Sequence, residues 1–72
     1  MSTDSYVGKE LESAARRLVR QYGTGTEDIL SGEAPFGMDP ADAHALGFIQ
    51  GVAAALDMTP ISALDEYAIQ LP

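Results

Sequence analysis

The chain has 72 residues, of which 46% are hydrophobic and 21% charged, and it contains no cysteine. This composition excludes a disordered chain, a disulfide scaffold and a thiolate zinc site, and the length fits one small domain with a thin core. The net charge of −7 is unevenly divided: residues 1–20 carry four bases and three acids, whereas residues 21–72 carry eight acids and no base. Such a surface repels nucleic acid and anionic lipid and favours a basic protein partner.

The N-terminus is polar, without the apolar stretch of a signal peptide. The longest apolar stretch, residues 45–56, is too short to span a bilayer. We therefore expect a cytoplasmic protein that does not bind membranes.

Apolar residues at the start of the chain recur at spacings of three and four, which is the periodicity of an amphipathic helix. The pattern predicts a first helix over about 6–22. Asp4 or Ser5 would cap its start, and Gly23 suits the left-handed residue after its end.

The next segment, residues 23–38, is rich in glycine and is predicted to be a connection with one short helix. Thr26 is a suitable N-cap, and the two acids after it suit the first turn of a helix over about 26–31. Phe36 lies between a proline and a glycine, and we expect its ring to anchor this loop onto the core.

Two further helices are predicted, each with a capping residue followed by proline. Asp39 begins a central helix over about 39–57, and Thr59 precedes a C-terminal helix over about 60–70, whose apolar stripe includes Ala68 and Leu71. No strand signal is present. The sequence therefore predicts an all-α fold, a small helical bundle of two long helices, a short helical turn and a C-terminal helix in a single domain covering the whole chain.

The central helix carries two unusual features. From residue 45 to 56 its only polar side chain is Gln50, and a helix apolar nearly all round is normally covered nearly all round. Small residues also recur at every fourth position, which lets two helix backbones approach closely. We expect a homodimer in which two central helices cross; the alternative is packing of these residues within one chain. This small-residue ridge consists of Ala43, Gly47, Gly51 and Ala55.

The residue types needed for catalysis form no recognisable pattern. The single histidine has no evident partner in a nucleophile–base pair, and no glycine-rich phosphate-binding loop is present. Asp39, Asp42 and His44 are metal-ligand types, but both aspartates suit the first turn of the central helix and the histidine points elsewhere. We therefore expect a non-enzymatic protein with no cofactor, no metal and no small-molecule substrate.

Two known helical arrangements share the order of these helices. A helix-turn-helix unit would use residues 60–70 as its recognition helix, which has no base to neutralise phosphates, so we expect no direct contact with nucleic acid. The outline also resembles acyl and peptidyl carrier proteins, and this resemblance implies a phosphopantetheine arm on a serine at the start of the second long helix. In this chain that position is occupied by residues 39–42, which read Asp-Pro-Ala-Asp and include no serine. A carrier or adaptor stays an alternative, as does a minor structural protein of an assembly.

The expected function is binding to another protein. A small acidic protein can regulate or inhibit a target by occupying its basic patch, as inhibitors from phages and mobile elements do with host regulators or defence complexes. Apolar and aromatic side chains beside arginines on the first helix, and acids beside a tyrosine on the last, suit an interface. We favour the acids as the binding surface. The expected partner-binding residues are Arg16, Leu18, Val19, Arg20, Tyr22, Asp65, Glu66 and Tyr67.

Overall fold

A computed structural model describes residues 3–32 and 34–72, without the side chains of Thr3 and Asp4. In chain order its elements are α1 (Thr3–Tyr22), a 3-10 turn η1 (Gly23–Gly25), α2 (Thr26–Ser31), α3 (Pro40–Ala55) and α4 (Pro60–Glu66). All regular structure in these residues is helical, which confirms the predicted all-α fold.

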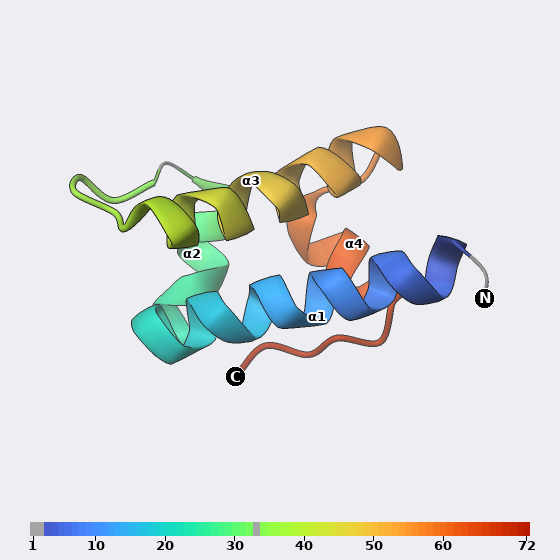
Figure 1. Ribbon diagram of the computed structural model, residues 1–72, viewed down its shortest axis with the longest axis horizontal. Coiled ribbons are helices and arrows are strands. Elements are labelled where there is room, and N and C mark those ends of the chain that lie inside the picture. Colours follow the sequence, from blue (N-terminus) through green and yellow to red (C-terminus); the bar gives the residue numbers. More distant parts are fainter. Residues whose placement is uncertain (1–2, 33) are drawn as a thin grey trace.

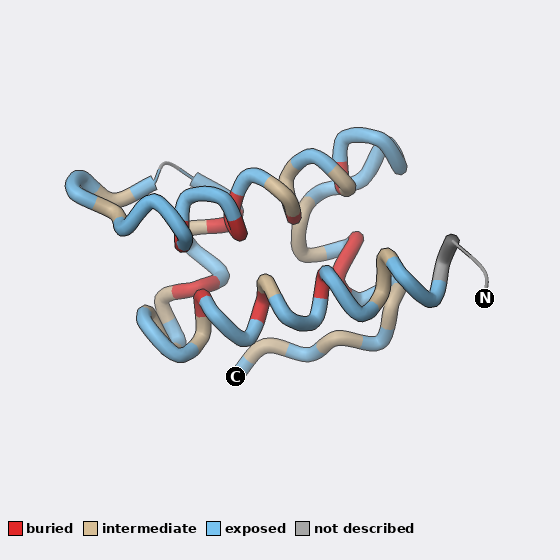
Figure 2. The backbone as a smooth tube through the Cα atoms, in the orientation of Figure 1, coloured by how far each residue is buried: buried red, intermediate tan, exposed pale blue. Residues whose placement is uncertain are grey.

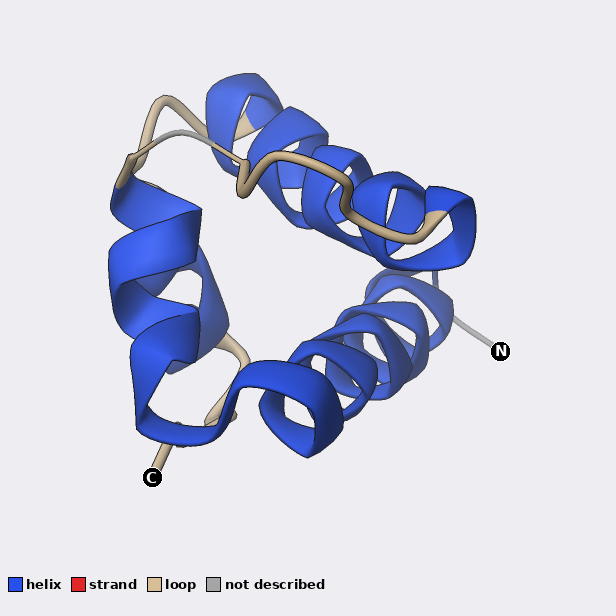
Figure 3. Cartoon of the chain, turned by 90° about the vertical axis from the view of Figure 1, so that its left-hand side faces the viewer, coloured by secondary structure: helices blue, strands red, loops and turns tan. Residues whose placement is uncertain are grey.

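The two long helices define the shape of the molecule. α1 and α3 run in opposite directions along the long axis, and α2 crosses between their ends (Figure 1, Figure 3). α4 bends by 80° from α3 and contacts α2. Among the described residues, no single helix is long and apolar enough to cross a membrane; α3 and α4 meet that criterion only as a bent pair.

One cluster of buried side chains forms the core, and every α-helix contributes to it. Leu11 and Leu18 of α1, Leu30 of α2, Ile49 of α3 and Leu64 of α4 are each at most 1% exposed. The buried positions face inward on each helix (Figure 2). Burial of each such side chain contributes roughly 1.5–3 kcal/mol, so the core depends on residues from all parts of the chain.

Asp39 and Thr59 cap α3 and α4, as the sequence predicts. Asp39 Oδ1 accepts a hydrogen bond from the Ala41 amide at 2.8 Å, and Thr59 Oγ1 accepts one from the Ser62 amide at 3.2 Å. Each bond satisfies an amide that the first helical turn leaves without a partner. The proline at the first position of each helix has no amide hydrogen that needs one.

The first two helices begin differently from the prediction. α1 begins at Thr3, so Asp4 and Ser5 lie inside its first turn and neither is its N-cap. α2 begins at Thr26, but this residue is buried and its hydroxyl donates to the Gly23 carbonyl at 2.8 Å, so it does not act as a cap. Gly23 has the expected left-handed backbone, with φ 55, and it begins the 3-10 turn that leads into α2.

α4 ends at Glu66 and not near residue 70, because Ala68 adopts a left-handed backbone with φ 59. The Ile69 amide donates to the Leu64 carbonyl at 2.9 Å, and the Ala68 amide donates to the Asp65 carbonyl at 2.9 Å. These two bonds form a Schellman motif, which usually has glycine at the left-handed position. The predicted helical stripe through Ala68 is therefore wrong.

The last four residues, 69–72, form an extended C-terminal segment that lies beside α1 on the side away from α3 (Figure 1). Ile69 and Leu71 are half-buried and pack against the core, whereas Gln70 and Pro72 are exposed. This alternation has the period of two that extended chains impose. Leu71 thus reaches the core from the C-terminal segment and not from a helix.

The expected anchoring role of Phe36 is also wrong, because its side chain is fully exposed. The Met38 amide donates to the Pro35 carbonyl at 3.3 Å, which closes a turn around Phe36 and Gly37. Gly37 has φ 78, the value that favours glycine at the third position of a type II turn. Phe36 therefore lies at the tip of the loop, and Met38 contacts the core in its place.

α3 is covered on one face only, although its composition predicts cover nearly all round. Its buried residues are Asp42, Ala45, Leu46, Ile49 and Ala53. All four residues of the small-residue ridge are exposed on the other side of the helix. A Cβ atom added to either ridge glycine would meet no atom within 4 Å. The ridge therefore does not pack within the chain.

Replacement of Ala68 by glycine tests the backbone strain at the end of α4. An L-residue in the left-handed region pays a steric cost that glycine avoids, so Ala68→Gly should raise the free energy of unfolding by about 0.5–1 kcal/mol. The same change at the exposed Ala54 inside α3 should lower it by about 0.5–1 kcal/mol. Urea denaturation followed by circular dichroism measures both. A loss of stability in both variants would show that Ala68 is not strained.

Candidate functional site

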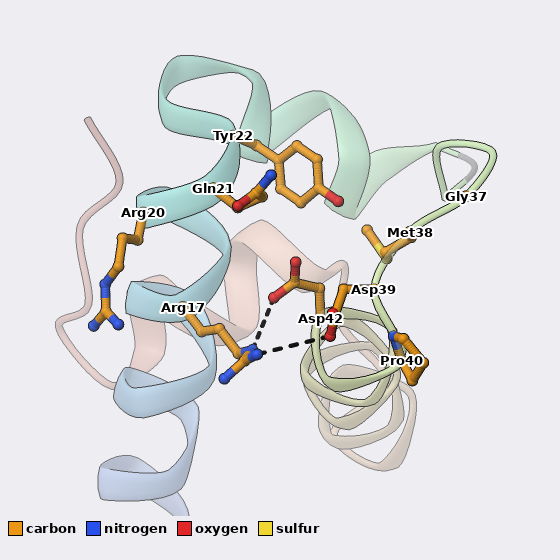
Figure 4. Close-up of a pocket in the computed structure, with 9 residues that line it drawn as sticks. All are labelled: Arg17, Arg20, Gln21, Tyr22, Gly37, Met38, Asp39, Pro40 and Asp42. Atoms are coloured by element: carbon orange, nitrogen blue, oxygen red, sulfur yellow. Dashed lines mark hydrogen bonds and ion pairs between the residues drawn. The ribbon is translucent and has the colours of Figure 1, made fainter.

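Arg17 of α1 joins two aspartates at the start of α3 (Figure 4). Its Nε atom donates to Asp42 Oδ1 at 2.8 Å, and its Nη2 atom lies 3.8 Å from Asp39 Oδ1. The Asp42 side chain is 7% exposed and that of Arg17 is 48% exposed. A buried carboxylate needs such a partner, since water cannot stabilise its charge. Asp42 therefore connects α3 to α1.

A hollow of about 580 Å³ lies beside this ion pair, between the end of α1 and the start of α3. Gln21 and Tyr22 border it, while Arg20 extends away from Asp42 (Figure 4). Because Arg17 already faces two carboxylates, its positive charge is not free to bind an anionic ligand in the hollow. Within 3–32 and 34–72, no three His, Asp or Glu side chains gather to hold a metal ion.

The exposed acids of α2 and α4 are in a different electrostatic situation. The two helices contact each other, and the sequence has no lysine or arginine after residue 20. Two of the α1 arginines are already paired, Arg17 as described and Arg16 with Glu12 at 2.8 Å. Glu27 and Asp65 border one groove, and Asp28 and Glu66 are the exposed acids next to them in the chain. We call these four residues the acidic face.

A groove of about 380 Å³ crosses the acidic face between α2, α4 and the C-terminal segment. The acids Glu27 of α2 and Asp65 of α4 both border it. Its other walls include four aliphatic side chains, of which only Leu64 is fully buried. We call it the α2–α4 groove, and these aliphatic residues are Ile61, Leu64, Ile69 and Leu71.

The partner-binding residues predicted on α1 are not equally accessible. Leu18 is 0% exposed in the core, so its predicted role as a partner anchor is wrong. Val19 is half-buried and lines a hollow shared with the C-terminal segment, and Tyr22 is half-buried against the core. Arg16 and Arg20 are exposed. α1 thus presents its arginines and Tyr6 to solvent and keeps its leucines for packing.

On α4, Asp65 and Glu66 are exposed as the prediction requires, but the neighbouring tyrosine is not a free anchor. Tyr67 is half-buried, and a Cβ atom added to Gly8 of α1 would lie 3.1 Å from its Cδ1 atom. Its ring therefore packs closely over Gly8 and holds the end of α4 against α1.

The sequence analysis missed the α2–α4 groove. Glu27 and Asp65 are far apart in the chain, and no local pattern indicates that they share one groove. The alternation of apolar and polar residues over 69–72 was the available signal for an extended segment that supplies Ile69 and Leu71 to it.

Comparison of the chain with protein-family models, with curated proteins and with solved structures found no match.

Arg17→Ala tests the ion pair between α1 and α3. It leaves the buried Asp42 carboxylate without its partner, and we expect the free energy of unfolding to fall by about 1–3 kcal/mol. The matched control is Arg16→Ala, at the position next to Arg17. It removes the exposed pair with Glu12 and should lower the free energy of unfolding by about 0.5 kcal/mol or less. Urea denaturation measures both. Equal losses would mean that Asp42 does not depend on Arg17.

Proposed function

We propose that the protein is a non-enzymatic interaction module that acts in the cytoplasm and regulates or inhibits a target protein by covering a basic surface on it. The observation that carries this proposal is the acidic face, where exposed carboxylates on two touching helices have no base on their own elements. Like charges on neighbouring helices repel one another, and a basic partner would replace that repulsion with attraction. The same field disfavours duplex nucleic acid and anionic lipid, so the partner is a protein.

Charge reversal on α4 tests the proposal. After the partner has been captured from the native lysate and purified, its association with the wild type and with Asp65→Lys/Glu66→Lys is followed by surface plasmon resonance. We expect the association rate of the double variant to fall about tenfold or more in low salt, because electrostatic steering accelerates encounter by such factors. The difference should shrink in about 1 M salt, where the Debye length is about 3 Å.

The matched control is Glu10→Lys/Glu12→Lys, which changes the net charge equally on exposed positions of α1 and removes only the exposed Glu12–Arg16 pair. This variant should associate at close to the wild-type rate if the position of the charge matters. Equal slowing of both double variants would show that only net charge acts. Unchanged rates and salt dependence in Asp65→Lys/Glu66→Lys would reject the acidic face as the binding surface.

We also propose that two copies associate through the exposed face of α3. Residues 45–56 have no charged side chain, so this face can meet its own copy without bringing like charges together. The chain exposes 4760 Å², whereas a folded monomer of 7.6 kDa exposes roughly 4,300 Å² by the usual scaling with mass. The excess is about half of the roughly 800 Å² that each partner buries in a standard interface. The open ridge glycines would let the two backbones approach closely.

Gly51→Leu tests this association. A Cβ atom at this exposed position meets no neighbouring element within 4 Å, so the monomer should fold and gain helix propensity, whereas two facing α3 helices would be pushed apart. The control is Gly51→Ala, which gains helix propensity but keeps the ridge small. Light scattering at high micromolar concentration should show a dimer for the wild type and for Gly51→Ala, and a lower dimer fraction for Gly51→Leu. A monomeric wild type would reject the dimer.

A further inference from the structure

The α2–α4 groove combines two kinds of surface that one ligand could use together. Its charged walls carry carboxylates only, from Glu27 and Asp65, while Ile61, Ile69 and Leu71 are half-buried and leave apolar area in contact with solvent. Its volume of about 380 Å³ is at the small end of the range of about 300–1,000 Å³ for ligand pockets. That size suits the insertion of a few side chains.

We propose that the α2–α4 groove binds a basic amphipathic segment of a partner protein, whose apolar side chain enters the groove while lysines or arginines contact Glu27 and Asp65. This inference rests on the proposed function and names the chemistry of the partner. Charge complementarity selects the occupant, since an acidic or neutral segment would leave both carboxylates without a counter-charge. A purely polar basic segment would leave the aliphatic walls in water. Recognition of an amphipathic segment by an apolar groove is a common mode of peptide binding.

The residues that line the groove are connected differently to the rest of the fold. Ile61, Leu64 and Asp65 lie on α4, whereas Ile69 and Leu71 lie on the C-terminal segment after the left-handed Ala68. The positions of Ile69 and Leu71 therefore depend on the turn at Ala68, and those of Glu27 and Asp65 do not. This separation allows the apolar and the electrostatic contributions to be changed independently.

The test uses three short synthetic peptides with residues in helical spacing, made of leucine and lysine, of serine and lysine, or of leucine and glutamate. Binding to the ¹⁵N-labelled wild-type protein is measured by NMR titration. We expect the leucine–lysine peptide to bind at least about tenfold more tightly than the serine–lysine peptide, since a buried apolar anchor is worth at least one decade in affinity. The leucine–glutamate peptide should not bind. The largest amide shifts should be at Ile61, Asp65, Ile69 and Leu71.

Two variants separate the contributions. Glu27→Lys should weaken both lysine peptides, and Leu71→Ser should weaken only the leucine–lysine peptide. Glu10→Lys makes the same charge change as Glu27→Lys on an exposed position of α1 outside the groove and should leave binding at close to wild-type strength. The wild-type shift map needs no variant, so the test holds even if Leu71→Ser unfolds the protein.

The outcomes distinguish this inference from the function on which it rests. Equal binding of both lysine peptides, with shifts around Glu27 and Asp65, would reject the groove and leave the acidic face in place. Shifts that cluster on α1 and α3 would reject both. If neither lysine peptide binds in low salt, both the groove and the acidic face are rejected. Tighter binding of the leucine–lysine peptide with shifts around the groove supports both.

Discussion

The contact between Arg17 and Asp42 determines how the two long helices of this protein sit on each other. Asp42 belongs to the buried face of α3, where a carboxylate without a partner would be costly. The buried cluster beside this contact also contains the small side chains of Ala15 and Ala45. A slide of one helical turn, about 5.4 Å, would break the 2.8 Å bond and leave Asp42 buried alone. The ion pair therefore favours the observed register of α1 on α3.

This use of Arg17 also shapes the surface. All four bases lie on α1, and the two ion-paired arginines face acids of α1 and α3. α2 and α4 carry acids and no base, and the fold brings these two helices into contact. The uneven distribution of charge along the sequence therefore produces an uneven distribution of charge on the surface. The acidic face follows from the topology as much as from the composition.

Features set by neighbouring residues could be predicted, and features set by distant residues could not. Asp39 and Thr59 cap their helices because a cap needs only its own side chain and the next amides. Phe36 and Ala68 were misjudged, since their positions depend on a turn geometry and on the core that the C-terminal segment reaches. Of the acidic face, Asp65 and Glu66 were predicted from the distribution of charge along the chain and from the predicted last helix, and both are exposed.

The remaining errors concern burial. Leu18 lies seven residues after Leu11 on the apolar stripe of α1, so its buried position is the normal outcome of the helical periodicity, which argued against its use as a partner anchor. Conversely, a helix that is apolar nearly all round suggests that other parts of the chain cover all of its faces, but only one face of α3 is buried. The composition of α3 predicted that it needs more cover than a short chain supplies. That the uncovered side is the one with the small-residue ridge can be seen only in the folded structure.

The two proposed surfaces are compatible because they lie on different sides of the molecule. The exposed face of α3 is uncharged, and the C-terminal segment that borders the α2–α4 groove lies on the side of α1 away from α3 (Figure 1). Two copies joined through α3 would keep both grooves open. The molecule is 21 Å across its shorter axes, so the acidic faces of the two copies would lie farther apart than the screening length of about 8 Å at physiological salt. Electrostatic repulsion would then oppose self-association only weakly. A dimer would present two acidic grooves to one basic target, and the linkage of the two binding events raises the overall affinity without any new contact.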